Sequence, residues 1–129
     1  MIGYITLGSN NLAAANLFYA QLLGSIGAKE LMKFGDAFTL YGTGFGSPGI
    51  AITAPYNGEA AMPGNGNMAA IVVDERAKVD ALYALALSLG GTCEGPPGLR
   101  GDEGPQAFYA AYFRDLDGNK LCAFRMGPA

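Results

Sequence analysis

The chain has 129 residues, of which half are hydrophobic and only 15% are charged, with a formal net charge of −3 and no histidine. A chain this apolar has enough material for a buried core and is not expected to be disordered. Its eight Lys and Arg residues are scattered singly, which argues against a nucleic-acid-binding surface and against a polybasic membrane anchor. No apolar run approaches the roughly 18 residues that span a bilayer.

The first half of the chain predicts one strand, one helix and three further short strands. Residues 2–8 are rich in β-branched and aromatic side chains, as strands are. Apolar residues recur at helical spacing from Leu12 to Ile26, which predicts a helix there. Asn10 or Asn11 can cap its N-terminus. The next strands are expected at 28–34, 37–42 and 49–54, separated by glycines.

After a Gly/Pro-rich linker at 55–66, the same order of elements starts again. Asp74 is expected to cap a second helix, and Asp117-Gly118 predicts a two-residue hairpin turn near the C-terminus. The other expected elements are strands at 67–73, 91–94, 107–113 and 119–125, with a Gly/Pro-rich loop at 95–105.

The two halves also resemble each other position by position. When they are superposed, Leu23 aligns with Leu87 among several similar pairs, and such self-similarity is the mark of duplication. A strand–helix–three-strand unit used twice predicts an α+β domain over 1–129. Repeat one covers about 1–60 and repeat two about 67–129.

The duplicated pattern and the segment Tyr112–Leu121, with Asp117-Gly118-Asn119-Lys120 at its turn, resemble the vicinal oxygen chelate superfamily. This superfamily includes glyoxalase I, the bleomycin-resistance proteins and the extradiol dioxygenases. The resemblance implies two βαβββ repeats that form a curled, eight-stranded mixed sheet, a cup with both helices on its outer face. It also implies a small-molecule ligand in the cup and a homodimer.

In that superfamily the cup holds a divalent metal through imidazole and carboxylate side chains on the first and last strands of each repeat. Aligned by motif, the resemblance puts other residues at these positions: Tyr4, Thr53, Asn67 and Cys122. Hard divalent ions need carboxylate or imidazole donors, which these side chains lack. We therefore expect no bound metal and no other cofactor.

The same four residues, together with Tyr112 and Arg114, are the candidates for ligand binding. Cys122 is equally compatible with core packing, since a free cysteine behaves as a small buried hydrophobe. Arg114 is also compatible with a structural ion pair. Asp102 and Glu103 are the best candidates for a general base in a chain without histidine. The loop that contains them is either a lid over the cup or a solvated connection.

Three functions are open at this point. The favoured one is binding of a small, partly aromatic molecule in a metal-free cup, because tyrosines, an amide and a thiol suit stacking and a few hydrogen bonds. The second is a lyase, isomerase or dioxygenase-like enzyme with a displaced or non-metal site. The third is a dimeric structural subunit whose cup is filled by the side chains of Tyr4, Phe38, Tyr41 and Tyr112.

The cysteines bear on the compartment. Cys93 and Cys122 are too few for a disulfide framework and match no zinc-binding spacing. The N-terminal residues show no signal-peptide pattern. Together these features predict a protein of the reducing cytoplasm.

Overall fold

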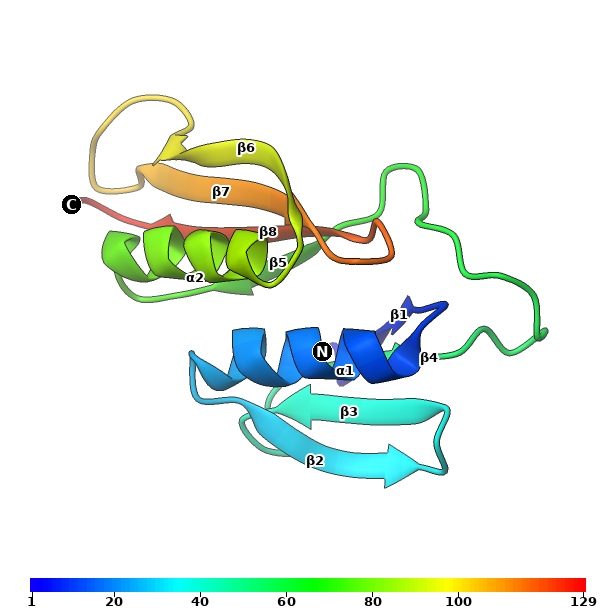
Figure 1. Ribbon diagram of the computed structural model, residues 1–129. Helices are drawn as coiled ribbons and strands as arrows, with labels where there is room; N and C mark the ends of the chain where they lie inside the picture. The colour runs from blue at the N-terminus through cyan, green and yellow to red at the C-terminus, as the bar shows by residue number, and fades with distance from the viewer. The chain divides into compact units, whose positions relative to one another are not determined.

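The computed structural model describes residues 1–129 and contains two compact units, Met1–Gly64 and Asn65–Ala129. Each unit has one strand, one helix and then three strands (Figure 1). This order confirms the α+β class and the two βαβββ repeats. Hydrogen-bonded strands stay within a unit, so the eight strands form two four-stranded mixed sheets. Neither helix is long and apolar enough to cross a bilayer.

The first unit begins its sheet and its helix close to the predicted positions. Its elements are β1 (Tyr4–Gly8), α1 (Leu12–Gly24), β2 (Lys29–Phe34), β3 (Phe38–Gly42) and β4 (Gly49–Thr53). The sheet has the order β1-β4-β3-β2, in which only β1 and β4 are parallel. The Asn11 side chain accepts a hydrogen bond from the Ala14 N–H at 3.1 Å, which confirms one of the two residues predicted to cap α1.

The second unit repeats this topology. Its elements are β5 (Ala69–Val72), α2 (Arg76–Ser88), β6 (Thr92–Leu99), β7 (Phe108–Arg114) and β8 (Lys120–Met126). The order is β5-β8-β7-β6, and again only the first and last strands are parallel. The predicted Asp74 cap is wrong, because α2 begins after Glu75, which makes no side-chain capping bond. Asp74 instead pairs with the Lys78 ammonium at 2.6 Å.

The Gly/Pro-rich segment after α2 is a strand where the sequence predicts a loop. β6 continues to Leu99, so the expected strand at 91–94 is too short and the expected loop at 95–105 begins too early. β6 lies at the edge of its sheet and pairs with β7 through two register irregularities. An edge strand tolerates Pro96 and Pro97, because one of its sides donates to no neighbour.

The hairpin between β7 and β8 closes through Asp115, which is buried. Its N–H donates to the Asn119 carbonyl at 3.0 Å. Its Oδ1 accepts from the N–H groups of Asp117 at 2.9 Å and Asn119 at 2.8 Å. Gly118 has φ 88°, a left-handed conformation that favours glycine. β7 ends at Arg114 and β8 begins at Lys120, so residues 115–119 form the connection, which is longer than the predicted two-residue turn.

Each helix packs against one face of its own sheet, and the alternation of side chains along a strand assigns the two faces. In the second unit the Tyr109 hydroxyl donates to Asp80 of α2 at 2.6 Å. Tyr109, Ala111 and Phe113 therefore face the helix, and Phe113 is fully buried there with its register partner Leu121. The opposite side, here called the helix-free face, carries Phe108, Ala110, Tyr112 and Arg114 of β7.

In the first unit the Tyr41 hydroxyl donates to the Asn16 side-chain oxygen of α1 at 2.6 Å. Burial raises the pKa of Tyr41, and the nearby Glu30 acts in the same direction, so the phenol keeps the proton that it donates. Tyr41 and its register partner Ile50 therefore face the helix. The helix-free face of this sheet carries Tyr4, Thr6, Phe38, Leu40, Ala51 and Thr53.

We expect Phe113→Ala to lower the free energy of unfolding by about 3–5 kcal/mol, because it empties a fully buried position between α2 and its sheet. The matched control is Phe45→Ala, where the side chain is 74% exposed and the expected change is within about 0.5 kcal/mol. Urea denaturation of both variants measures the difference. Equal losses would contradict the placement of Phe113.

Candidate ligand-binding site

The two candidates of the first unit share a face but lie at opposite ends of it. Tyr4 pairs with Gly49, and Thr53 pairs with Gly8. The pairing offsets them by the length of β1, which is about 13 Å at the usual rise per residue. Side chains this far apart do not converge on one small ion.

Tyr4 and Phe38 form the aromatic part of this face. Tyr4 is 52% exposed, and its ring meets the Phe38 ring edge-to-face with centroids 5.8 Å apart. Edge-to-face pairs are a favoured aromatic geometry. The two rings thus contact each other, which is part of the filling that the structural-subunit hypothesis requires, while half of Tyr4 stays accessible.

In the second unit the structure brings two candidates together. Tyr112 and Cys122 are register partners on the helix-free face. Burial raises the pKa of the Cys122 thiol, while a hydrogen bond from Tyr112 and the charges of Arg100 and Lys120 act in the opposite direction. The net rise keeps Cys122 a neutral thiol near neutral pH, which makes it a poor nucleophile. Asn67 is exposed and precedes β5, so it is not part of the paired strands.

The donor chemistry of both sheets does not fit a divalent metal. The first and last strands place the following residues on the helix-free faces: Tyr4, Thr6, Gly8, Gly49, Ala51 and Thr53 in the first unit, and Ala70, Val72, Lys120, Cys122, Phe124 and Met126 in the second. None offers an imidazole or a carboxylate, so no shift of the family alignment by a residue or two would supply one. No group of three or more His, Cys, Asp or Glu side chains that could hold a metal exists elsewhere in the chain.

Arg114 has two structural partners. Its Nε donates to the Glu94 carboxylate at 2.6 Å and its Nη1 to the Gly118 carbonyl at 2.8 Å. The hydrogen bond from Arg114 is the main reason that the pKa of Glu94 is lowered. Arg114 therefore forms the structural ion pair that was one of the two roles considered for it. Its two hydrogen bonds connect β6 to the turn between β7 and β8.

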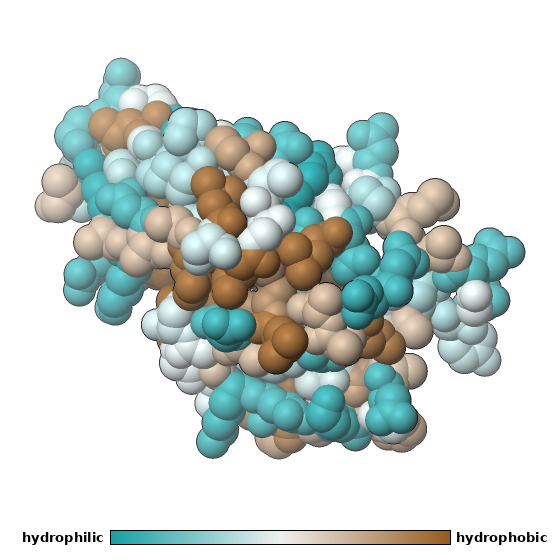
Figure 2. Space-filling view, viewed as in Figure 1, coloured by the Kyte–Doolittle hydropathy of each residue, from teal (hydrophilic) through white to brown (hydrophobic).

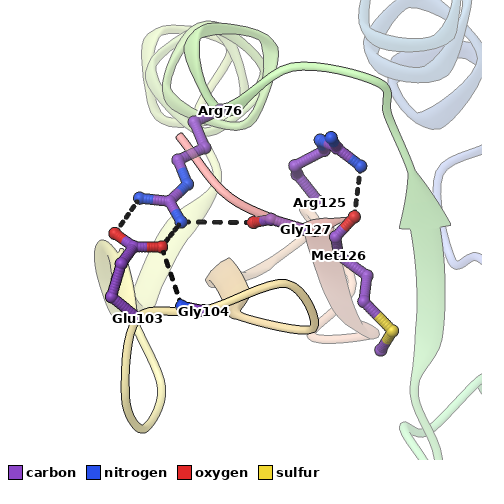
Figure 3. A network of polar contacts seen from close by, with 6 residues as sticks. All are labelled: Arg76, Glu103, Gly104, Arg125, Met126 and Gly127. Carbon is purple, nitrogen blue, oxygen red and sulfur yellow. Dashed lines mark hydrogen bonds and ion pairs between the residues drawn. The ribbon is translucent and has the colours of Figure 1, made fainter.

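The two candidate bases lie in the loop between β6 and β7. Asp102 is exposed. The Glu103 carboxylate is held by the Arg76 guanidinium, with 2.9 Å between Oε2 and Nη1, and Arg76 also donates to the Gly127 carbonyl at 3.2 Å (Figure 3). Arg76 lies over the ring of Tyr109, which faces α2, so Glu103 is anchored on the helix side of the sheet. The hydrogen bond from Arg76 lowers the pKa of Glu103, which weakens it as a base.

Sequence reasoning missed Arg100 and Lys120, which the structure brings to the ring of Tyr112. The Arg100 Cζ lies 5.3 Å and the Lys120 Nζ 5.4 Å from the ring centroid, within the range of cation–π contacts. The alternation of β8 gave a signal for Lys120, because it lies two residues before Cys122 and therefore on the same face. Arg100 gave none, because its segment was expected to be an unstructured loop.

Residues 1–123 match the Glyoxalase/Bleomycin resistance protein/Dioxygenase superfamily. The chain therefore belongs to this superfamily, which confirms the resemblance to vicinal oxygen chelate proteins. A solved glyoxalase/bleomycin resistance protein from Albidiferax ferrireducens is 34% identical, with 97% of this chain and 98% of that chain covered and a TM-score of 0.84.

More distant solved structures share the fold. A glyoxalase/bleomycin resistance protein/dioxygenase family enzyme from Burkholderia phytofirmans is 20% identical over 95% of this chain and 96% of that one, with a TM-score of 0.71. Lactoylglutathione lyase from Agrobacterium tumefaciens is 20% identical, with 97% of this chain and 92% of that chain covered and a TM-score of 0.66. No curated protein sequence matches the chain.

The two cysteines should differ sharply toward an alkylating reagent. Cys93 is exposed and Cys122 is buried, so iodoacetamide near neutral pH should modify Cys122 more than about tenfold more slowly, because only the accessible thiolate reacts. Since the pKa of Cys122 is raised, its rate of modification should increase only at a higher pH than is needed for an ordinary thiol. Mass spectrometry of each peptide measures this, with urea-unfolded protein as the control in which both react. Equal rates in the folded protein would contradict the placement.

Proposed function

We propose that this superfamily member binds a small, partly aromatic molecule on the helix-free face of its second sheet, without a metal ion. The observation that carries the proposal is the group of rings on that face. Phe108 and Phe124 lie with centroids 5.3 Å apart and planes tilted by 31°, and Tyr112 stands on the same strand as Phe108. All three side chains are partly exposed, so they offer stacking surface to a flat ligand.

The state of the polar groups favours binding over turnover. A general base needs a free group whose pKa lies near the working pH. Glu94 and Glu103 each pair with an arginine that lowers the carboxyl pKa, and Cys122 is a neutral buried thiol. None of these groups therefore suits proton transfer or nucleophilic attack, and binding is the function that remains.

We further propose that the protein is a homodimer in a reducing compartment such as the cytoplasm. Both cysteines are free, which fits such a compartment. The single chain leaves several large apolar side chains among polar ones at its surface (Figure 2). Exposed apolar area of this kind is commonly covered by a partner. The most exposed such residues within helices and strands are Leu17, Phe34 and Val72.

We expect one- and two-ring aromatic compounds to stabilise the protein against heat. A ligand present at a hundredfold excess over its Kd adds about 2.7 kcal/mol, which raises Tm on the order of 10 °C for a domain of this size. Tyr112→Ala should reduce binding measured by calorimetry, whereas Tyr56→Ala, at a fully exposed position, should not. No stabilisation by any compound of a broad aromatic panel would refute the proposal.

We expect protein purified without tags or chelators to contain no stoichiometric metal, because no donor set on either helix-free face suits one. Elemental analysis for Ni, Zn, Mn and Fe measures this, and added metal should leave Tm unchanged. About one metal per chain or per dimer would instead favour an enzyme that uses a displaced site.

A further inference from the structure

We propose that the ligand is an aromatic carboxylate, whose carboxylate group binds between Lys120 and Arg100 beside the Tyr112 ring. The inference rests on the proposed function and adds a charge requirement to it. It is carried by three features of the second sheet: a guanidinium fixed in place before any ligand binds, an excess of positive charge around one ring, and an apolar surface next to it.

The Arg100 guanidinium is held by β6, the strand that ends one residue before it. Its Nη2 donates to the Pro96 carbonyl at 2.7 Å and its Nη1 to the Gly98 carbonyl at 3.0 Å. Gly95 and Gly98 leave room for this arrangement. A Cβ at Gly95 would lie 3.2 Å from Nη2 and 3.1 Å from a Tyr112 ring carbon, and one at Gly98 would lie 3.3 Å from Nη1. The glycines of β6 thus let the guanidinium lie against the strand, and a group held in this way loses little freedom on binding an anion.

Positive charge exceeds negative charge around the Tyr112 ring. Arg100 and Lys120 both lie within 5.4 Å of its centroid. Neither Arg100 nor Lys120 takes part in any of the chain's ion pairs, and the Glu94 carboxylate is hydrogen-bonded to Arg114 at 2.6 Å. An anion bound here gains attraction from two cations that are in no ion pair.

The apolar surface continues along the same strands. Phe124 lies two residues beyond Cys122 on β8, and Phe108 lies four residues from Tyr112 on β7, at alternating positions of one face. Ala110 and Cys122 lie between these positions in the register, and both are fully buried beneath the larger side chains. A molecule that has a carboxylate at one end and a flat ring at the other matches this sequence of charge and apolar surface.

The test compares 2-naphthoate with 2-naphthamide, which has the same ring and nearly the same size but no charge, by isothermal titration calorimetry. We expect 2-naphthoate to bind at least about tenfold more tightly, the effect of one charge-assisted hydrogen bond, and to weaken as salt is added. Lys120→Gln should remove most of this preference. Arg100→Gln is a second, independent variant, and the control is Lys29→Gln, an exposed lysine of the first unit.

The outcomes separate this inference from the function on which it rests. A preference for 2-naphthoate that Lys120→Gln or Arg100→Gln abolishes, and Lys29→Gln does not, supports the inference. Equal binding of the two compounds overturns it and leaves the proposed function standing. A preference that all three variants reduce equally also overturns it, since the effect is then one of overall charge. If neither compound binds, this inference fails, and the broad aromatic panel decides the proposed function.

Discussion

Each sheet of this protein has two faces but only one helix, so one face stays without a helix to cover it. On the helix side, apolar side chains such as Phe113 and Leu121 pack into a core from which water is excluded. On the other side the strands carry side chains that have no helix to pack against, and they cover one another only in part. The topology therefore leaves one face of each sheet without a helix, and the residues on that face determine its chemistry.

In this chain those residues differ from the donors that the superfamily pattern implies. The first and last strands present hydroxyl, thiol, amine and apolar groups on the helix-free faces, so the chemistry of a hard divalent ion has no support there. Around Tyr112 the structure offers two cations and several rings instead. Charge and stacking are the interactions that such a surface offers. Family membership thus defines the scaffold, and the side chains of this particular chain define the chemistry of the surface.

Much of the fold could be predicted from local patterns. The helical periodicity, the Asn11 cap and the repeat of the two halves are properties of neighbouring residues or of direct self-similarity, and the structure confirms them. The main error concerns a segment whose state depends on a distant partner. β6 is a strand because β7 lies beside it and its other edge is unpaired, although its glycines and prolines favour a loop. The Asp74 error is local, because α2 begins one residue later, after Glu75, and Asp74 pairs with Lys78.

The candidate site shows the same division. Cys122, Tyr112 and Arg114 could be named from motif and alternation, because strand periodicity places them on one face. That Arg100 folds back over β6 toward Tyr112, and that Glu103 is held by Arg76 on the opposite side of the sheet, could not be read from the residues. The sequence alone determines the order of the elements, the repeat of the two halves and the face on which each strand residue lies, because all three follow from short-range periodicity. Only the tertiary structure decides which charged side chains come together. Those contacts depend on the pairing of β6 with β7 and on the return of the following loop to α2, which join residues far apart in sequence.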